Sequence, residues 1–180
     1  MTDPTAAAAF ESRYLRDVLG NFPTSVVAVT TIDDDDGAPV GMVVGSFTSV
    51  SLDPPLVSFL VDRSSSTLPK VLQAGRFCAN ALAADQEWLC RQMARKGVDR
   101  FDGVAWTRSD HDNPILGGVV AWVDCTIEKT VELGDHFLVV GRIGDLTVES
   151  SVKGPLLFFR GGYGDYRSTA QLLLDSHLGR

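Results

Sequence analysis

The stretch that decides the fold is GMVVGSFTSVSLDPPLV, residues 41–57. Apolar, β-branched segments stand at both of its ends, and between them hydroxyl side chains alternate with apolar ones ahead of two prolines. Alternation with a period of two is typical of a half-buried strand, and the proline pair fixes how the chain enters the next strand. The stretch therefore predicts β-strands on both sides of a hydroxyl-rich run.

Strand patterns also dominate the rest of the chain. They cover residues 25–32, 39–46, 56–61, 76–82, 119–131, 136–143, 147–149 and 155–160, with an acidic turn at 33–37 and a hairpin turn at 134–135. Helical patterns cover only 10–22, which is amphipathic, 68–73 and 85–95. Many strands joined by short turns favour an antiparallel barrel with helical caps over a doubly wound α/β sheet. We therefore expect a mainly β fold with flanking helices.

Length and composition restrict the class of protein. The chain has 180 residues, of which 44% are hydrophobic and 22% charged, and this size suits one domain. We expect the domain at 10–166, after a tail at 1–9. The extension at 167–180 could form a helix over 169–178 that is used in dimer contacts. The net charge of −7 argues against a nucleic-acid partner. No apolar run approaches the roughly 20 residues of a membrane span, and residues 1–9 lack a signal-peptide pattern. We expect a cytoplasmic protein that binds a small molecule and not a membrane.

The common catalytic and metal motifs are missing. There is no GxGxxG after a strand, no GxxxxGK[ST], no HExxH and no GxSxG, which argues against dinucleotide folds of the Rossmann type and against hydrolases. Cys78, Cys90 and Cys125 lack metal spacing and are expected to be buried thiols, and residues 33–36 lack the ligand spacing of a calcium loop. No metal site is predicted. His111, in a loop at 108–113, is expected to be exposed.

Two polar clusters remain within apolar, strand-forming surroundings, at 45–51 and at 62–67. The first reads either as an edge strand that faces water or as a rim that hydrogen-bonds a flat heterocycle. The second precedes a helix, where hydroxyl and backbone N–H groups suit a phosphate, although simple capping of the helix explains it equally well.

Five blocks of the chain, in order, resemble the flavin reductase family with the FMN-binding split-barrel fold: 41–57, 74–82, 99–101, 134–136 and 155–163. The resemblance spans about residues 10–166. It implies a split β-barrel that works as a homodimeric NAD(P)H:flavin oxidoreductase. Such an enzyme transfers hydride from NADH or NADPH to FAD or FMN and supplies reduced flavin to a separate monooxygenase.

The resemblance also implies roles for individual residues. Gly45, Ser46, Thr48 and Ser49 would line the isoalloxazine ring, with Phe47 in the same run, and Asp62, Ser64, Ser66 and Thr67 would approach the ribityl chain and phosphate, with Ser65 among them. Asn80 and Ala81 would close the floor of the site, and Arg100 and Phe101 would flank it. His136, the expected catalytic residue, would lie beside the nicotinamide, and Arg160, Gly161, Gly162 and Tyr163 would lie near the dinucleotide. Many relatives carry Asn in place of Gly45 and Thr in place of Val43, so the flavin could be held loosely.

Two other functions compete with this hypothesis. A flavoprotein that retains its flavin could oxidise an organic substrate, and it would lose flavin slowly. A non-catalytic flavin-binding module would bind flavin without steady oxidation of NAD(P)H. The sequence leaves open FAD against FMN and NADH against NADPH, since Arg63, Arg160 or Arg167 could each serve a 2′-phosphate.

Overall fold

The computed structural model describes residues 10–149 and 154–169. Its elements are α1 (Ser12–Leu19), β1 (Thr24–Ser25), β2 (Val27–Ile32), β3 (Pro39–Val44), β4 (Thr48–Leu52), β5 (Pro55–Asp62), α2 (Leu68–Ala74), β6 (Arg76–Ala81), α3 (Glu87–Met93), β7 (Trp106–Arg108), β8 (Pro114–Leu116), β9 (Ala121–Leu133), β10 (His136–Val148), β11 (Leu156–Phe159) and β12 (Gly162–Asp165). Strands dominate, as the sequence predicts.

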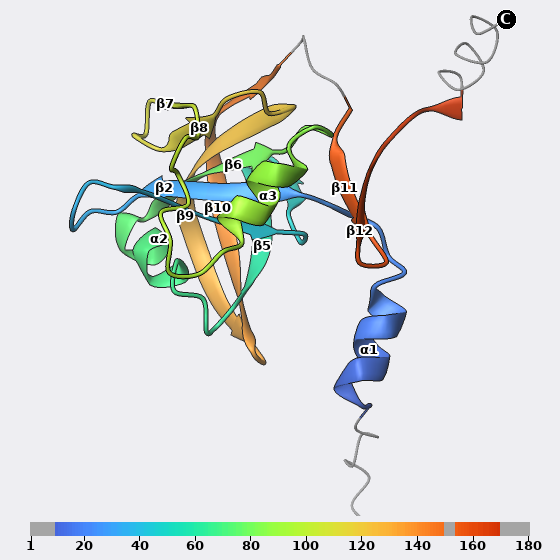
Figure 1. Cartoon of the computed structure of the whole chain (residues 1–180). Coiled ribbons are helices and arrows are strands. Elements are labelled where there is room, and N and C mark those ends of the chain that lie inside the picture. The colour runs from blue at the N-terminus through green and yellow to red at the C-terminus, as the bar shows by residue number, and fades with distance from the viewer. Residues whose placement is uncertain (1–9, 150–153, 170–180) are drawn as a thin grey trace, which may run out of the picture.

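Seven strands form the main sheet, in the order β3-β2-β6-β9-β10-β5-β4, and every neighbouring pair is antiparallel. The sheet curls without closing, so β3 and β4 remain its edges, and the predicted mainly β, split-barrel fold is confirmed. A small sheet, β1-β11-β12, lies beside the barrel and next to α1 (Figure 1). The β7-β8 hairpin covers another part of the barrel. The 13-residue strands β9 and β10 meet at the predicted turn, where Gly134 has a φ of 62°.

Two clusters of buried side chains form the core. One fills the barrel around Phe59 and Phe77, whose rings meet edge to face at 5.2 Å. The other lies where α3 and β8 cover the sheet, around Leu89, Met93 and Leu116. Gly141 allows the first cluster to pack closely, because a Cβ at this position would lie 2.5 Å from Cζ of Phe77.

Several element boundaries differ from the predictions. The strand expected at 25–32 is divided at Val26, whose N–H donates to Leu156 O, so β1 joins the small sheet and β2 the main sheet. The strand expected at 39–46 ends at Val44, and a separate strand, β4, follows as an edge. The strands expected at 136–143 and 147–149 form one strand, β10. The amphipathic helix is present as α1, but no residue of it is buried.

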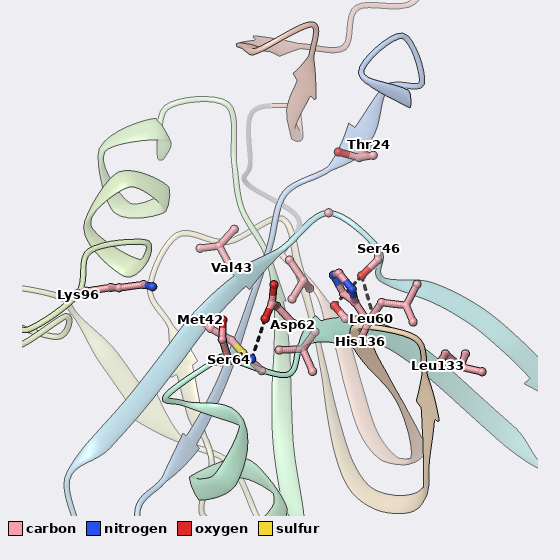
Figure 2. A pocket seen from close by; sticks show the side chains of 14 residues that line it. Thr24, Met42, Val43, Ser46, Leu60, Asp62, Ser64, Lys96, Leu133 and His136 are labelled. Carbon is pink, nitrogen blue, oxygen red and sulfur yellow. Dashed lines mark hydrogen bonds between the residues drawn. The ribbon is translucent and has the colours of Figure 1, made fainter. Parts of the chain in front are cut away.

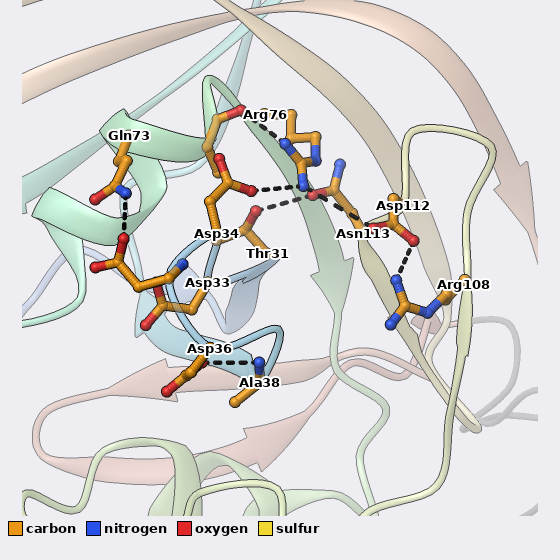
Figure 3. A network of polar contacts seen from close by, with 12 residues as sticks. Thr31, Asp33, Asp34, Asp36, Ala38, Gln73, Arg76, Arg108, Asp112 and Asn113 are labelled. Atoms are coloured by element: carbon orange, nitrogen blue, oxygen red, sulfur yellow. Dashed lines mark hydrogen bonds and ion pairs between the residues drawn. The ribbon is translucent and has the colours of Figure 1, made fainter.

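The acidic turn is less solvated than expected, because three of its side chains have partners on α2 or β6. Asp33 is only 2% exposed, and its carboxylate lies 2.5 Å from Nζ of Lys70. Asp34 accepts from Arg76 at 3.0 Å, and Asp35 accepts from Gln73 at 2.8 Å (Figure 3). The turn is therefore joined to α2 and β6.

The loop at 108–113 is the tip of the β7-β8 hairpin, and it corrects the expectation for His111. Nδ1 of His111 lies 2.7 Å from Oδ2 of Asp124, which is fully buried. Oδ1 of the same carboxylate accepts from Asn113 at 2.7 Å, and Asn113 accepts from Thr31 at 3.0 Å. His111 is therefore half-buried and tied to the main sheet.

The three cysteines are free and buried, as expected. Burial raises the pKa of Cys78 far above its usual range and that of Cys125 to about 12. The expected tail at 1–9 lies outside the described residues, as does the expected helix at 169–178 apart from its first residue. Within the described part of the chain, no helix is long and apolar enough to cross a membrane.

Candidate functional site

A cavity of about 920 Å³, here called the main cleft, opens where β3 and β5 end and β10 begins. Its lining is mostly apolar and comes from segments far apart in the sequence (Figure 2). The lining residues are Thr24, Met42, Val43, Val44, Gly45, Ser46, Leu60, Val61, Asp62, Ser64, Ser65, Lys96, Leu133 and His136. Apolar walls with a few polar groups suit a flat organic ligand whose edges form hydrogen bonds.

Gly45 and Ser46 shape the wall that follows β3. A Cβ at Gly45 would lie 2.9 Å from Oγ1 of Thr24, so glycine lets the β1 segment approach the cleft. Oγ of Ser46 donates to Leu60 O at 3.1 Å and accepts from Leu60 N at 2.8 Å. The Ser46 hydroxyl therefore joins this wall to β5.

Asp62 and His136 lie side by side on neighbouring strands, since they are paired in the register of β5 and β10. Oδ1 of Asp62 accepts from Ser64 N at 2.7 Å, and the hydrogen bonds from Ser64 hold the pKa of Asp62 below its usual value. Nδ1 of His136 lies 2.7 Å from Oδ1 of Asp135, and this bond lowers the pKa of Asp135. With Nδ1 engaged, Nε2 of a neutral His136 is available as an acceptor.

A second cavity of about 350 Å³, here called the polar annex, lies next to the main cleft. Its lining includes Gly41, Ser66 and Gly97, each the chain neighbour of a residue in the main cleft. Its polar side chains are Ser66, Thr67, Lys70, Asp99 and Arg100. Positive charge and hydroxyl groups suit the phosphate end of a ligand whose ring lies in the main cleft.

Arg100 and Thr67, which both line the annex, are already hydrogen-bonded to each other. Nη1 of Arg100 donates to Gly41 O at 2.6 Å and to Oγ1 of Thr67 at 2.9 Å, so Arg100 joins β3 to the start of α2. Oγ of Ser65 accepts from the backbone N–H of Thr67 and of Leu68, both at 3.3 Å. Ser65 thus performs the capping that the sequence offered as an alternative, and this leaves Ser66 with no capping role.

A side cavity of about 170 Å³ shares Thr24, Val43, Val44 and Gly45 with the main cleft and is closed by Tyr163. Sγ of Cys90 lies 3.3 Å from the Tyr163 hydroxyl oxygen, and this contact, with burial, raises the pKa of Tyr163 to about 12. The guanidinium of Arg91 lies 5.1 Å from the centre of the same ring. These contacts hold the β11-β12 hairpin against α3.

The structure brings together only part of the predicted site. Six predicted residues line the main cleft: Gly45, Ser46, Asp62, Ser64, Ser65 and His136. Three more, Ser66, Thr67 and Arg100, line the annex, and Tyr163 lines the side cavity.

The other predicted residues lie outside these cavities. Phe47 packs on the core, while Thr48 and Ser49 are exposed on β4, in line with the edge-strand alternative. Asn80 is fully buried, and its amide donates to Thr30 and accepts from Leu116 N. Ala81 lies in the barrel wall, and Phe101 lies in the core. Arg160 and Gly161 form the turn of the β11-β12 hairpin, and Gly162 begins β12.

Sequence reasoning missed eight residues of the main cleft: Thr24, Met42, Val43, Val44, Leu60, Val61, Lys96 and Leu133. Most are apolar strand residues that the sequence cannot distinguish from core. Lys96 could have been found, because it is a cation next to a glycine and three residues before the 99–101 block.

The main cleft and the annex together fit a flavin. The volume of the cleft lies within the range of about 300–1,000 Å³ that is usual for cofactor pockets. Apolar side chains can cover the faces of a tricyclic ring, while the hydroxyl groups and Asp62 border its edge. The annex offers Ser66, Lys70 and Arg100 to a phosphate.

Comparisons with known proteins agree with this fit. Residues 19–167 match the model of the flavin reductase like domain. A flavin reductase of Pseudomonas putida is 50% identical over 159 residues, which cover 88% of this chain and 92% of the relative. The crystal structure of a homologue of nitrilotriacetate monooxygenase component B from Mycobacterium thermoresistibile matches with a TM-score of 0.84 and 38% identity, over 89% of each chain.

An NADH:FAD oxidoreductase of Streptomyces globisporus, solved with NAD and FAD fragments, matches with a TM-score of 0.82 and 33% identity over 91% of this chain and 99% of that one. Family model, sequence relatives and solved structures agree over most of the chain. The chain therefore belongs to the family of proteins with a flavin reductase like domain.

Proposed function

We propose that this protein is an NAD(P)H:flavin oxidoreductase that reduces FAD or FMN in the main cleft and releases the reduced flavin to a separate monooxygenase. The observation that carries the proposal is the pair of neighbouring cavities, a mostly apolar one that suits the ring and a polar one with Lys70 and Arg100 that suits the phosphate. Two relatives named as reductase subunits or components of flavin-dependent monooxygenases support the partner.

The chemistry belongs to the two cofactors, because a nicotinamide delivers hydride directly to a flavin and needs no strong acid or base from the protein. The residues of this chain bind and orient. Apolar side chains from β3 and β5 exclude water from the ring, and Ser65, Ser66 and Arg100 shape the phosphate end. His136, at the start of β10, stands at the rim and would orient the nicotinamide through Nε2.

FAD and NADH are the cofactors that we favour, on the strength of the Streptomyces globisporus neighbour and its NAD and FAD fragments. Two of the residues that line the annex, Gly97 and Val98, are exposed to solvent. A flavin with a bulkier tail than FMN can therefore extend beyond it.

A homodimer is part of the proposal, because α1 and the segments beside it expose several large apolar side chains. The side chains of Phe10, Tyr14, Leu19 and Phe22 are each at least 59% exposed. Apolar patches of this kind mark interaction surfaces in soluble proteins, and a second copy presents the same face. Sedimentation velocity should give a dimer mass, and a monomer at micromolar concentration would contradict this part.

The experiment that tests the function mixes purified protein with NADH or NADPH and with substoichiometric or excess FAD or FMN under air. Loss of the nicotinamide absorbance is followed. We expect turnover that saturates with free flavin, which identifies both cofactor preferences. Tightly retained flavin with negligible turnover would contradict the proposal and favour a flavoprotein that acts on an organic substrate.

A further inference from the structure

Asp62 is the one carboxylate among the residues that line the main cleft. Its side chain lies near the centre of the lining, and Oδ1 is held by Ser64 N at 2.7 Å (Figure 2). Asp62 ends β5 and is paired in register with His136. A turn thus fixes a carboxylate beside the space in which we place the flavin ring.

This carboxylate is ionised at neutral pH, because hydrogen bonds from Ser64 lower its pKa. The nearby side chains of His136 and Lys96 have smaller effects on this pKa, and Asp62 forms no ion pair among the described residues. Lys96 approaches from the loop after α3, and its ammonium has no hydrogen-bond or ion-pair partner in the described part of the chain. The negative charge of Asp62 is therefore not neutralised by contact.

The reaction changes the charge of the ligand in this cleft. Hydride carries two electrons and one proton, so a neutral oxidised ring becomes an anionic reduced ring, while the neutral dihydronicotinamide becomes a nicotinamide cation. No further proton is needed for this balance. A fixed anion beside the ring raises the energy of the reduced flavin and leaves that of the oxidised flavin nearly unchanged.

We propose that Asp62 makes the main cleft discriminate between the two redox states of flavin, weakening the binding of the reduced form and favouring its release. The inference rests on the proposed function, specifically on the ring lying in the main cleft. Lys96 acts in the opposite direction, because its positive charge attracts the reduced ring. The balance of these two charges sets how readily the product leaves.

The test compares wild type with Asp62→Asn and measures two dissociation constants. Oxidised flavin is titrated by fluorescence, and chemically reduced flavin is titrated without oxygen. We expect the ratio of the reduced to the oxidised dissociation constant to fall about tenfold in Asp62→Asn, from like charges a few Å apart. For this two-electron couple, tenfold is a rise of about 30 mV in the potential of the bound flavin.

Asp145→Asn is the matched control. Asp145 lies on β10 outside the three cavities, its carboxylate also accepts a backbone N–H, from Leu146 at 2.7 Å, and the variant changes the net charge of the protein by the same amount. We expect its ratio to equal that of wild type. Lys96→Met should raise the ratio, because it removes the opposing charge. If Asp62→Asn does not fold, Asp62→Ser, which also removes the negative charge, takes its place and should lower the ratio as well.

Each outcome has one meaning. An unchanged ratio in Asp62→Asn overturns the inference, whether both constants stay as in wild type or change equally. An equal change would make Asp62 a hydrogen-bond acceptor for the ribityl chain. The same shift in Asp145→Asn overturns it as well. If wild type binds neither form of flavin or does not oxidise NAD(P)H, the proposed function fails instead.

Discussion

The β9-β10 hairpin connects two polar regions that differ in how their polar groups are paired. Toward its open end, the carboxylate of Asp124 is fully buried and uses both oxygens, for His111 and for Asn113. At its turn, His136 and Asp62 border a cavity, and each has only a local contact, with Asp135 and with Ser64. The first region satisfies its own polar groups, whereas the second retains groups that can meet a ligand.

This difference separates stability from function. A buried carboxylate that loses its partners, or leaves them unpaired, costs several kcal/mol. A half-exposed side chain at a cavity rim contributes little to folding, because water replaces its contacts. Substitutions in the two regions should therefore affect different measurements.

The largest expected effect on stability is that of Asp124→Ala. The variant leaves His111 and Asn113 facing an empty site inside the fold, and we expect a loss of about 3 kcal/mol in the free energy of unfolding, or roughly 10 °C in Tm. Urea denaturation with calorimetry measures it. Flavin affinity of the folded fraction should stay within about twofold of wild type.

Asp124→Asn keeps the shape and one acceptor, so its loss should be smaller. A loss below about 0.5 kcal/mol in Asp124→Ala would show that this region does not stabilise the barrel as the buried hydrogen bonds indicate. A large loss of flavin affinity in a folded variant would instead couple the two regions.

A smaller effect, seen in catalysis and not in stability, is expected for His136→Ala. We expect KM for NAD(P)H to rise about tenfold, because the orienting imidazole is lost, while flavin affinity and the free energy of unfolding change little. Steady-state kinetics with saturating flavin measures this. His111→Ala is the matched control, with lower stability and an unchanged KM; loss of flavin binding in His136→Ala would contradict the assigned role.

The same comparison explains what the sequence can and cannot predict. Strand patterns and the turn at 134–135 depend on local chemistry, so the mainly β fold can be predicted from the sequence. The resemblance to a known family further predicts the split barrel, and it predicts that Gly45, Asp62 and His136 contribute to one cavity. Asn80 carries an amide that resembles a ligand-binding group, but the register of β6 turns it into the core, where it bonds Thr30 and Leu116.

His111 and Lys96 show why the rest is not predictable. A lone histidine in a polar loop normally faces water, and only the fold brings the buried Asp124 to within 2.7 Å of it. Lys96 belongs to no strand pattern, and its place at the cleft depends on the loop that Arg100 fastens to β3. Contacts between distant segments decide both positions.

The smallest effect is expected for Asp33→Asn, which tests an ion pair between the acidic turn and the annex, since Lys70 lines the annex and pairs with Asp33 at 2.5 Å. The Lys70 bond lowers the pKa of Asp33 below its usual 3.8, and the pKa of Lys70 is raised above 10.5. The pair therefore stabilises the fold fully between about pH 5 and pH 9, and this contribution is lost as the pH falls through the lowered pKa of Asp33 or rises through the raised pKa of Lys70. Urea denaturation across this range should show wild type more stable than Asp33→Asn by a constant difference that is smaller than for Asp124→Ala and closes at both ends. A difference that is unchanged at pH 2 would mean that the ion pair contributes nothing and that the Asp33 side chain stabilises the turn through the hydrogen bond that it accepts from the N–H of Asp35.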